Sequence, residues 1–323
     1  MSNKLELGEE QDRLCKEIRQ MVRDENVCHV RIVGEPGLGK SRLVLESLAR
    51  DGLSQLVVYV PHAEDFQNSR LYHDILHPDA DYCLILVLDE CRPRECKEIW
   101  DRLSNHSDRC MVVSLDHDSY HPSDERFVQI ECPRLEDEKI EKIIDSYTGQ
   151  EGSGRRWSEL CSGVPRVAHA IGQNLKTNPD DLLKSPSMNL IWERFISGYR
   201  SIESSEAKEK LIVLRYIALF HRFGFETPVE SEGKFISDLI EADHGISYAR
   251  FQSIVAELKR QRILQGKVTL FIAPKLLHVH LWTQFWELHG RGISIGGLFQ
   301  QIPDEIRSWF VRMFPYALSL IHI

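Results

Sequence analysis

The segment that most constrains the fold is the octapeptide Gly34-Glu35-Pro36-Gly37-Leu38-Gly39-Lys40-Ser41, which fits the pattern G-x-x-x-x-G-K-[ST] at every fixed position. It follows a strand-like segment at residues 27–33 and precedes a run with helical spacing at residues 40–50. A glycine-rich turn between a buried strand and a helix directs backbone N–H groups and a helix N-terminus at one point, which favours phosphate. The sequence therefore predicts a nucleotide-phosphate loop in an α/β domain.

Each fixed residue of this motif has a chemical reason. Glycines let backbone N–H groups turn inward around the phosphates. Lys40 is expected to reach the β- and γ-phosphates, and the Ser41 hydroxyl to bind Mg²⁺. The predicted nucleotide-binding residues are the whole loop from Gly34 to Ser41 together with Arg42, and Lys40 is also assigned a catalytic role.

A second element, Leu84-Ile85-Leu86-Val87-Leu88-Asp89-Glu90, has the form of an apolar strand that ends in acid. Asp89 is predicted at the metal, and Glu90 as the base that polarises water for attack on the γ-phosphate. The alternative is a solvated strand end. An adjacent Asp-Glu pair resembles the P-loop ATPase branch with an added catalytic strand. Residues 174–177 do not fit the guanine motif N-K-x-D, so ATP is the expected nucleotide.

The hydrophobic pattern divides the chain into segments. Strand-like runs at residues 27–33, 55–60, 83–88, 110–115 and 126–130 alternate with helical patterns, which predicts a three-layer α/β sandwich with a parallel sheet. The expected domains are a P-loop nucleotide-binding domain with an N-terminal helix at 1–133, a helical lid at 134–185, a linker at 186–203, a winged-helix domain with a hairpin near 263–271 at 204–290, and the start of a helical sensor region at 291–323.

The order of these segments, with Gly163-Val164-Pro165-Arg166 in the lid, looks like the STAND branch of AAA+-type ATPases, over residues 5–290. This class contains immune receptors and bacterial antiviral sensors. The resemblance implies that Gly163 and Pro165 lie near the adenine and sugar. It also implies that a histidine closing the winged helix touches the ADP β-phosphate. His278 resembles that position, although Val279 stands where the family usually has Asp.

The family's sensor position departs from the usual pattern. Many relatives end the corresponding strand with Thr, Asn or Arg beside the γ-phosphate, whereas this chain has Val113-Ser114-Leu115-Asp116. Ser114 could take the role, and we assign it as a catalytic candidate. The absence of an arginine there favours slow hydrolysis and a switch rather than a motor. The resemblance implies that ADP holds the lid and winged helix closed, and that exchange for ATP, with Mg²⁺, lets the protein oligomerise.

A DNA-acting AAA+ initiator or loader is the alternative function. Residues 250–275 contain six basic side chains and only one acid, Glu257, which could form a DNA-binding patch. The net charge is −9, however, and residues 204–289 contain 11 basic and 10 acidic residues. Bulk attraction to nucleic acid or to an anionic membrane is therefore not expected. The expected partners are further copies of the chain and a trigger of unknown identity, such as a phage or cellular protein.

The remaining composition indicates a cytoplasmic protein. The longest apolar run, residues 83–88, is far shorter than the roughly 20 residues of a membrane span. The charged N-terminal segment lacks the apolar core of a signal peptide. The eight cysteines form no C-x-x-C pair, and a disulfide framework is not expected in a chain of this size.

The C-terminal segment carries a separate expectation. Apolar residues recur with helical spacing between Ile302 and Phe314, and one helix cannot bury such a stripe alone, so further helical repeats are expected to follow. The last six residues, Leu318 to Ile323, are what one reading frame of a common transposon mosaic-end adapter would encode. We therefore expect the natural sequence to depart from this one at or near Leu318; a genuine C-terminal hexapeptide is the alternative.

Overall fold

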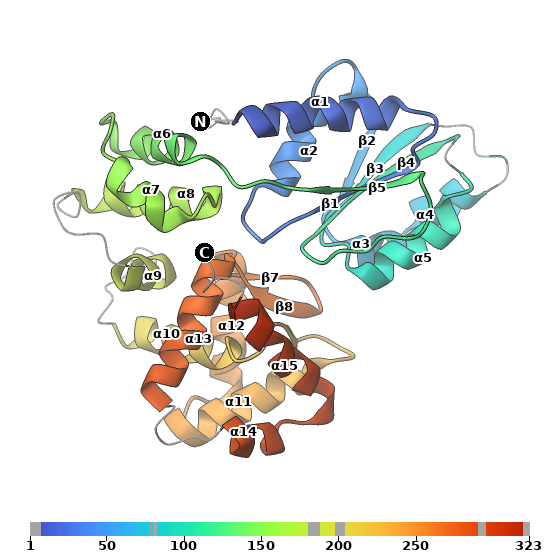
Figure 1. The fold of residues 1–323 in the computed structure, drawn as a ribbon. Coiled ribbons are helices and arrows are strands. Elements are labelled where there is room, and N and C mark those ends of the chain that lie inside the picture. The colour runs from blue at the N-terminus through green and yellow to red at the C-terminus, as the bar shows by residue number, and fades with distance from the viewer. Residues whose placement is uncertain are drawn as a thin grey trace. The chain divides into compact units, whose positions relative to one another are not determined.

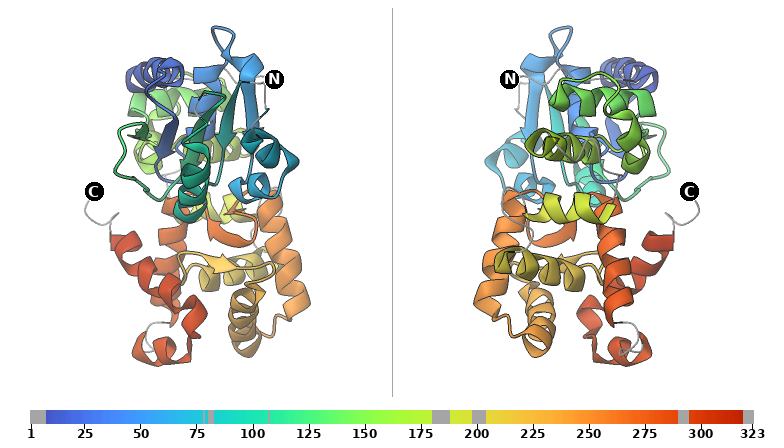
Figure 2. Two further views of the ribbon diagram at one scale, coloured as in Figure 1. Left: turned by 90° about the vertical axis from the view of Figure 1, so that its right-hand side faces the viewer. Right: turned by 90° about the vertical axis from the view of Figure 1, so that its left-hand side faces the viewer.

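The computed structural model describes residues 8–77, 79, 83–106, 108–179, 188–197, 204–289 and 295–318. The chain divides into two compact units, residues 1–179 and 180–323 (Figure 1, Figure 2). The first contains the parallel sheet and the predicted lid, and the second contains the remaining helices and a small sheet. None of the helices in the described part of the chain combines the length and apolar character that a bilayer span requires.

The sheet of the first unit has five parallel strands in the order β2-β3-β4-β1-β5, which confirms the predicted α/β sandwich. β4 lies between β1 and β3, which is the added strand that the Asp-Glu pair suggested. All residues of β1, β3 and β4 are buried, because helices cover both faces of these strands. The strands are β1 (His29–Val33), β2 (Val57–Val60), β3 (Leu84–Leu88), β4 (Cys110–Asp116) and β5 (Phe127–Glu131).

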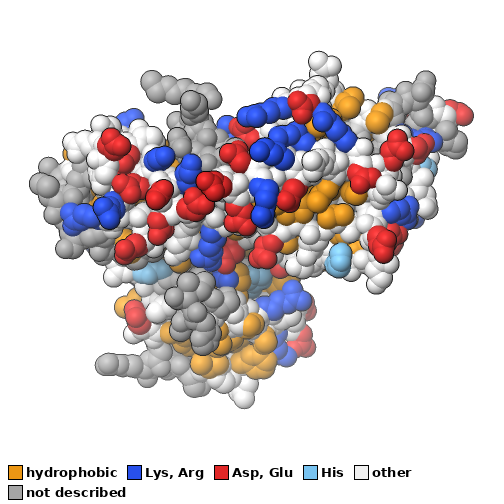
Figure 3. All heavy atoms as spheres, turned by 45° about the horizontal axis from the view of Figure 1, so that its top comes forward, with side chains coloured by type: hydrophobic (Ala, Val, Ile, Leu, Met, Phe, Trp, Pro, Cys, Tyr) orange, Lys and Arg blue, Asp and Glu red, His pale blue; other side chains and the backbone are white. Residues whose placement is uncertain are grey.

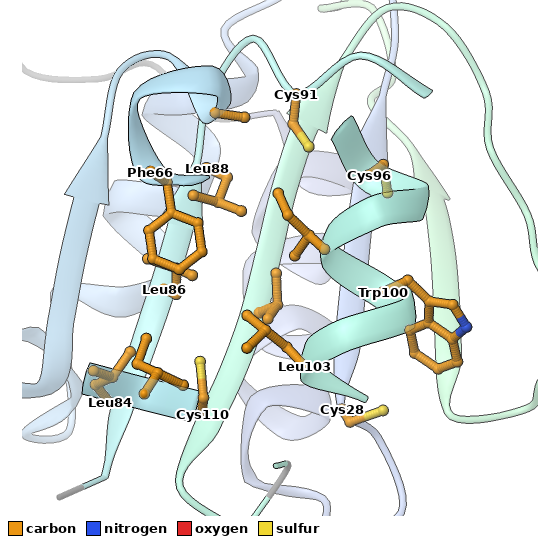
Figure 4. Packing of buried hydrophobic residues seen from close by; sticks show 14 of the residues in the cluster. Cys28, Phe66, Leu84, Leu86, Leu88, Cys91, Cys96, Trp100, Leu103 and Cys110 are labelled. Atoms are coloured by element: carbon orange, nitrogen blue, oxygen red, sulfur yellow. The ribbon is translucent and has the colours of Figure 1, made fainter. Parts of the chain in front are cut away.

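Helices pack on the two faces of this sheet (Figure 1). One face carries α1 (Glu9–Arg23) and α2 (Lys40–Leu48); the other carries α3 (Ala63–Gln67), α4 (Arg70–Leu76) and α5 (Pro93–Leu103), and a 3-10 turn at Leu53–Leu56 leads into β2. Alternate β3 residues point to opposite faces. Leu84, Leu86 and Leu88 accordingly pack in one core with Phe66 and Leu103 (Figure 4).

The helix α5 begins directly after the predicted acidic pair. Pro93 occupies its first turn, where a missing N–H has no cost. Cys91 precedes the N-cap residue, and Cys96 is the fourth residue of the helix. Apolar side chains at these two positions form a hydrophobic staple, and both cysteines are fully buried (Figure 4). This packing fixes the direction in which the chain leaves the end of β3.

The predicted lid consists of α6 (Asp137–Thr148), α7 (Arg155–Cys161) and α8 (Pro165–Thr177), and it belongs to the first unit. α6 ends at Gly149, whose left-handed backbone (φ 70°) is the common helix terminator. α8 begins with Pro165 in its first turn. The two helices pack on each other.

The second unit contains a helix–strand–helix–helix–strand–strand order, which is the element order of a winged helix. These elements are α10 (Ser205–Ile217), β6 (Phe223–Gly224), α11 (Glu230–His244), α12 (Tyr248–Arg260), β7 (Leu264–Gln265) and β8 (Thr269–Ile272). The antiparallel β7–β8 pair is the hairpin that the sequence predicted, and β6 completes the sheet in the order β6-β8-β7. Part of the expected linker is α9 (Met188–Ser197), whose Ile191, Trp192 and Ile196 are buried.

The C-terminal helices are α13 (Lys275–His289), α14 (Ile295–Gln301) and α15 (Asp304–Leu318). The apolar stripe on α15 differs from expectation, because Ile306, Phe310 and Met313 are buried within the second unit. The Phe310 ring lies 5.9 Å from that of Phe220, which follows α10. These three side chains are therefore covered within the part of the chain that the structure describes. Residues 319–323 of the suspected adapter segment lie outside the described residues.

Candidate nucleotide-binding site

The phosphate loop joins β1 to α2 at the carboxyl edge of the sheet. Two of its glycines adopt left-handed backbone angles, with φ 97° at Gly37 and φ 92° at Gly39. A side chain at Gly37 would also lie 3.2 Å from atoms of both Val164 and Arg166 in the lid. Gly37 is therefore required both by the turn and by the close approach of the lid.

Lys40 points back into the curve of the loop. Its ammonium group donates to the carbonyl oxygens of Gly34 at 2.6 Å and Glu35 at 3.1 Å. Burial lowers the pKa of Lys40, although nearby carboxylates such as Asp89 oppose that shift. A cation held inside a ring of backbone groups at a helix N-terminus matches the demands of a polyphosphate.

The Asp89 carboxylate lies at the end of β3, beside Ser41. The Ser41 hydroxyl donates to Asp89 Oδ2 at 2.5 Å, and the Tyr59 hydroxyl donates to the same oxygen at 2.6 Å. The Glu90 backbone N–H donates to Asp89 Oδ1 at 2.9 Å. A hydroxyl and a carboxylate in contact form a hard oxygen donor set, which suits Mg²⁺. The two residues predicted to hold the metal are thus adjacent.

Glu90 has the left-handed backbone angle φ 49°, which is strained for a residue with a side chain. Its carboxylate is within 2.8 Å of His62 Nδ1. This hydrogen bond raises the pKa of His62, although burial of the ring opposes the shift. The predicted catalytic carboxylate is therefore held by a residue that follows β2, which the sequence analysis did not single out.

The lid lies directly against the phosphate loop. The Arg166 N–H donates to the carbonyl of Gly37 at 3.3 Å. Within the lid segment, the Leu135 N–H donates to the carbonyl of Gly163 at 2.9 Å. Pro165 is partly exposed at the start of α8. The predicted lid motif and the phosphate loop, far apart in sequence, are in contact within one unit.

A second connection between loop and lid comes from Arg134, which follows β5. Its Nη2 donates to both carboxylate oxygens of Glu35, at 3.1 and 3.0 Å. Its Nη1 donates to the carbonyl of Ser162 at 3.1 Å. The Arg134 guanidinium thus contacts the phosphate loop through one nitrogen and the lid through the other. Arg134 was missed in the sequence because nothing local distinguishes it from a surface arginine.

Ser114 differs from its predicted role beside the γ-phosphate. Its side chain is fully buried, and its hydroxyl lies 2.7 Å from His29 Nε2 and 3.8 Å from the sulfur of Cys96 on α5. The period of two along β4 turns this position toward the α5 face of the sheet. The serine therefore belongs to the interior packing beneath α5.

Arg31 is a buried charge in β1, between β4 and β5, that the sequence analysis also missed. Its guanidinium donates to the carbonyls of Cys91 at 3.0 Å and Asp118 at 2.6 Å, and lies 3.7 Å from Asp116 Oδ2. These contacts tie the chain after Glu90 to the loop that follows β4. A usable signal was present, because an arginine within a strand expected to be buried must find buried partners.

Two further residues differ from their predicted roles: the His278 side chain is buried, and the Arg42 side chain points into solvent. His278 lies on α13 of the second unit, is fully buried, and places Nε2 3.3 Å from the carbonyl of Ala218. Burial lowers its pKa to about 4. The Arg42 side chain is exposed and pairs with Glu46 one turn along α2 at 2.6 Å, so only its backbone faces the loop.

The strand order, the phosphate loop and the acidic pair at the end of β3 make the first unit a P-loop NTPase domain. No protein-family model matches the chain, and no curated protein matches it in sequence.

Comparison with solved structures gives distant likenesses. A STAND protein with a tetratricopeptide repeat sensor from Pyrococcus horikoshii is 13% identical, with a TM-score of 0.44, over 98% of this chain and 49% of that chain. Drosophila ORC bound to DNA is 12% identical, with a TM-score of 0.40, over 87% and 89%. The Aeropyrum pernix ORC1 protein in complex with DNA is 15% identical, with a TM-score of 0.42, over 86% and 91%.

Proposed function

We propose that this chain is the core of a STAND-type signalling ATPase, a switch that binds ADP or ATP with Mg²⁺, hydrolyses ATP slowly and oligomerises after exchange. Lys40 and the backbone of residues 34–42 would hold the phosphates, Ser41 and Asp89 the cation, and Glu90 would orient the attacking water. When bound, Mg²⁺ would neutralise charge on the phosphates.

The observation that carries this proposal is the contact of the lid with the phosphate loop. Gly37 accepts a hydrogen bond from Arg166, and Glu35 pairs with Arg134, which also binds Ser162. A nucleotide in the loop would therefore touch the lid, and we propose that the lid leaves the loop when ADP is exchanged for ATP. Coupling of nucleotide identity to lid position is what a switch requires.

The DNA-acting alternative has less support from the second unit. Arg250 pairs with Glu209 at 2.6 Å, and Lys259 pairs with Glu226 at 3.1 Å. The exposed positions of α12 are mostly small and neutral: Ala249, Gln252, Ser253 and Ala256, with Arg260 at the end. On the face of the first unit seen in Figure 3, Lys and Arg are interspersed with Asp and Glu. DNA-binding surfaces are normally dominated by positive charge.

The test is to identify the nucleotide that the purified chain retains. Protein purified without added nucleotide is denatured, and the supernatant is analysed by chromatography. Stoichiometric ADP is the expected result, because a closed lid slows release. An empty site that fills and empties rapidly with ATP, together with tight duplex-DNA binding, would instead favour the initiator function.

A further inference from the structure

Tyr59 contacts the predicted metal ligand from the edge strand of the sheet. Its hydroxyl donates to Asp89 Oδ2 at 2.6 Å, and the residue is 40% exposed, so Tyr59 borders the solvent side of the site. Asp89 Oδ2 also accepts from Ser41, and Oδ1 accepts from the Glu90 backbone. Nothing in the phosphate-loop motif or the acidic strand motif includes this residue.

The sheet itself sets the position of Tyr59. Tyr59 pairs with Val87 in the parallel β2–β3 register, and the Asp89 N–H donates to the carbonyl of Val60 at 2.9 Å. The hydroxyl thus reaches Asp89 from a strand hydrogen-bonded to the same segment of chain. A phenol has only two side-chain torsions, so the geometry is held at low entropic cost.

The hydrogen-bond count of Asp89 shows what this contact does. An ionised carboxylate offers about four acceptor sites. Three are used by Ser41, Tyr59 and the Glu90 N–H, which fixes the plane of the group and leaves about one site for a cation or its water. Without Tyr59 the carboxylate would keep only Ser41 on Oδ2, and Ser41 is itself a predicted metal ligand.

We propose that Tyr59 is a positioning residue for the divalent cation: its hydroxyl holds the Asp89 carboxylate in the orientation that binds the metal. This inference rests on the proposed nucleotide function and adds a residue to it. The Tyr59 hydroxyl acts through Asp89, so its loss changes the metal dependence of nucleotide binding rather than nucleotide binding itself. Loss of an outer partner of a metal ligand typically weakens metal affinity about 10- to 100-fold.

The test uses the full chain, a fluorescent non-hydrolysable ATP analogue and Mg²⁺. For the parent and Tyr59→Phe, analogue affinity is measured in EDTA and across a Mg²⁺ titration. We expect equal affinity in EDTA, and a Mg²⁺ midpoint at least about tenfold higher in the variant, restored by excess Mg²⁺. Mn²⁺ bound in the presence of the analogue, counted by electron paramagnetic resonance, should fall in parallel. Tyr72→Phe removes a hydroxyl from a partly buried tyrosine on α4 and serves as the matched control.

The outcomes separate the two proposals. An unchanged Mg²⁺ midpoint in Tyr59→Phe, with a parent that responds to Mg²⁺, overturns the positioning role alone. The positioning role is also overturned if Tyr59→Phe loses as much analogue affinity in EDTA as it does in Mg²⁺. In that case the hydroxyl would support the fold of the loop rather than the metal site. A parent that binds no analogue, or binds it without regard to Mg²⁺, overturns the metal–nucleotide site and both proposals together. Thermal melts of the three proteins establish that all are folded at the assay temperature.

Discussion

At the scale of single residues, Lys40 contributes the charge on which phosphate binding depends. Its ammonium already faces the ring of loop carbonyls. We expect Lys40→Ala to weaken ATP binding by more than about 100-fold, since a charged hydrogen bond contributes roughly 3 kcal/mol. Calorimetry measures this directly. Arg42→Ala is the control, because that side chain pairs with Glu46 and its loss should leave affinity nearly unchanged. If Lys40→Ala bound ATP with the affinity of the parent, the loop would not be the phosphate-binding site.

Glu90 allows binding and chemistry to be separated. Glu90→Gln keeps the shape of the side chain and leaves Asp89 and Ser41 in place, so nucleotide affinity should remain near that of the parent. Turnover should fall by about 100-fold or more, because the amide cannot accept a proton from water. Single-turnover hydrolysis measures the chemical step. Hydrolysis at the parental rate would mean that another group is the base.

The lowered pKa of His278 makes the stability of the second unit depend on pH. Burial lowers its folded-state pKa from 6.5 to about 4, so the unfolded chain binds more protons between these values. The contribution of neutral His278 is therefore complete above pH 6.5 and is lost progressively as the pH falls toward 4. Its size is on the order of 3 kcal/mol.

Denaturant unfolding at several pH values tests this dependence. The free energy of unfolding of the parent should fall between pH 6.5 and 4, and His278→Gln should show a flatter profile even if it is less stable throughout. Parallel profiles for the two proteins would assign the acid sensitivity to other groups.

The sequence predicted the residues of the site that are contiguous in the chain. The phosphate loop and the acidic pair each form from local geometry, so eight and two adjacent residues were enough to place them. The sequence did not predict three other residues of the site, Tyr59, His62 and Arg134. Strand pairing and lid packing, rather than neighbours in the sequence, bring them to the carboxylates and the loop. Ser114 was misplaced because a motif position does not say which face of the strand it occupies.

At the scale of elements, the strands were predicted well because buried parallel strands are continuous apolar runs. Segment 275–280 was harder, since alternating His278 and His280 fit a half-buried strand or a helix end. It forms the first turns of α13, where Leu277, His278 and Leu281 are buried at helical spacing. The small strand β6 was missed because two residues give no period to detect.

The connection between phosphate loop and lid yields a prediction for Arg134. Arg134→Met should speed ADP release by roughly threefold, which is the size of a partly exposed ion pair. Glu35→Gln should have the same or a smaller effect, because Arg134→Met also removes the hydrogen bond to the Ser162 carbonyl. The double variant should add little to Arg134→Met, because the ion pair is already broken in that variant. Stopped-flow displacement of a fluorescent ADP measures the rates. Additive effects would show that the two residues act independently.

At the scale of the whole molecule, the choice between switch and initiator depends on DNA. We expect duplex DNA to bind weakly and without sequence preference, and the exposed pair Arg260→Glu/Arg262→Glu to leave ATP turnover unchanged. Fluorescence anisotropy across a salt series provides the measurement. Tight binding with a steep salt slope, abolished in this double variant, would support the DNA-acting alternative. The variant leaves the pairs at Arg250 and Lys259 intact, so its effect would not come from broken ion pairs.

The strand order has a consequence for how the protein folds while it is being synthesised. β1 reaches both of its neighbours only late, because His29 pairs with Val112 in β4 and with Phe127 in β5. Long-range parallel pairing of this kind folds slowly, and N-terminal segments leave the ribosome first. β1 and the glycine loop that follows it must therefore wait, unpaired, until the residues of β4 have been translated. During that interval the nascent chain is a natural client for chaperones that cover exposed hydrophobic strands.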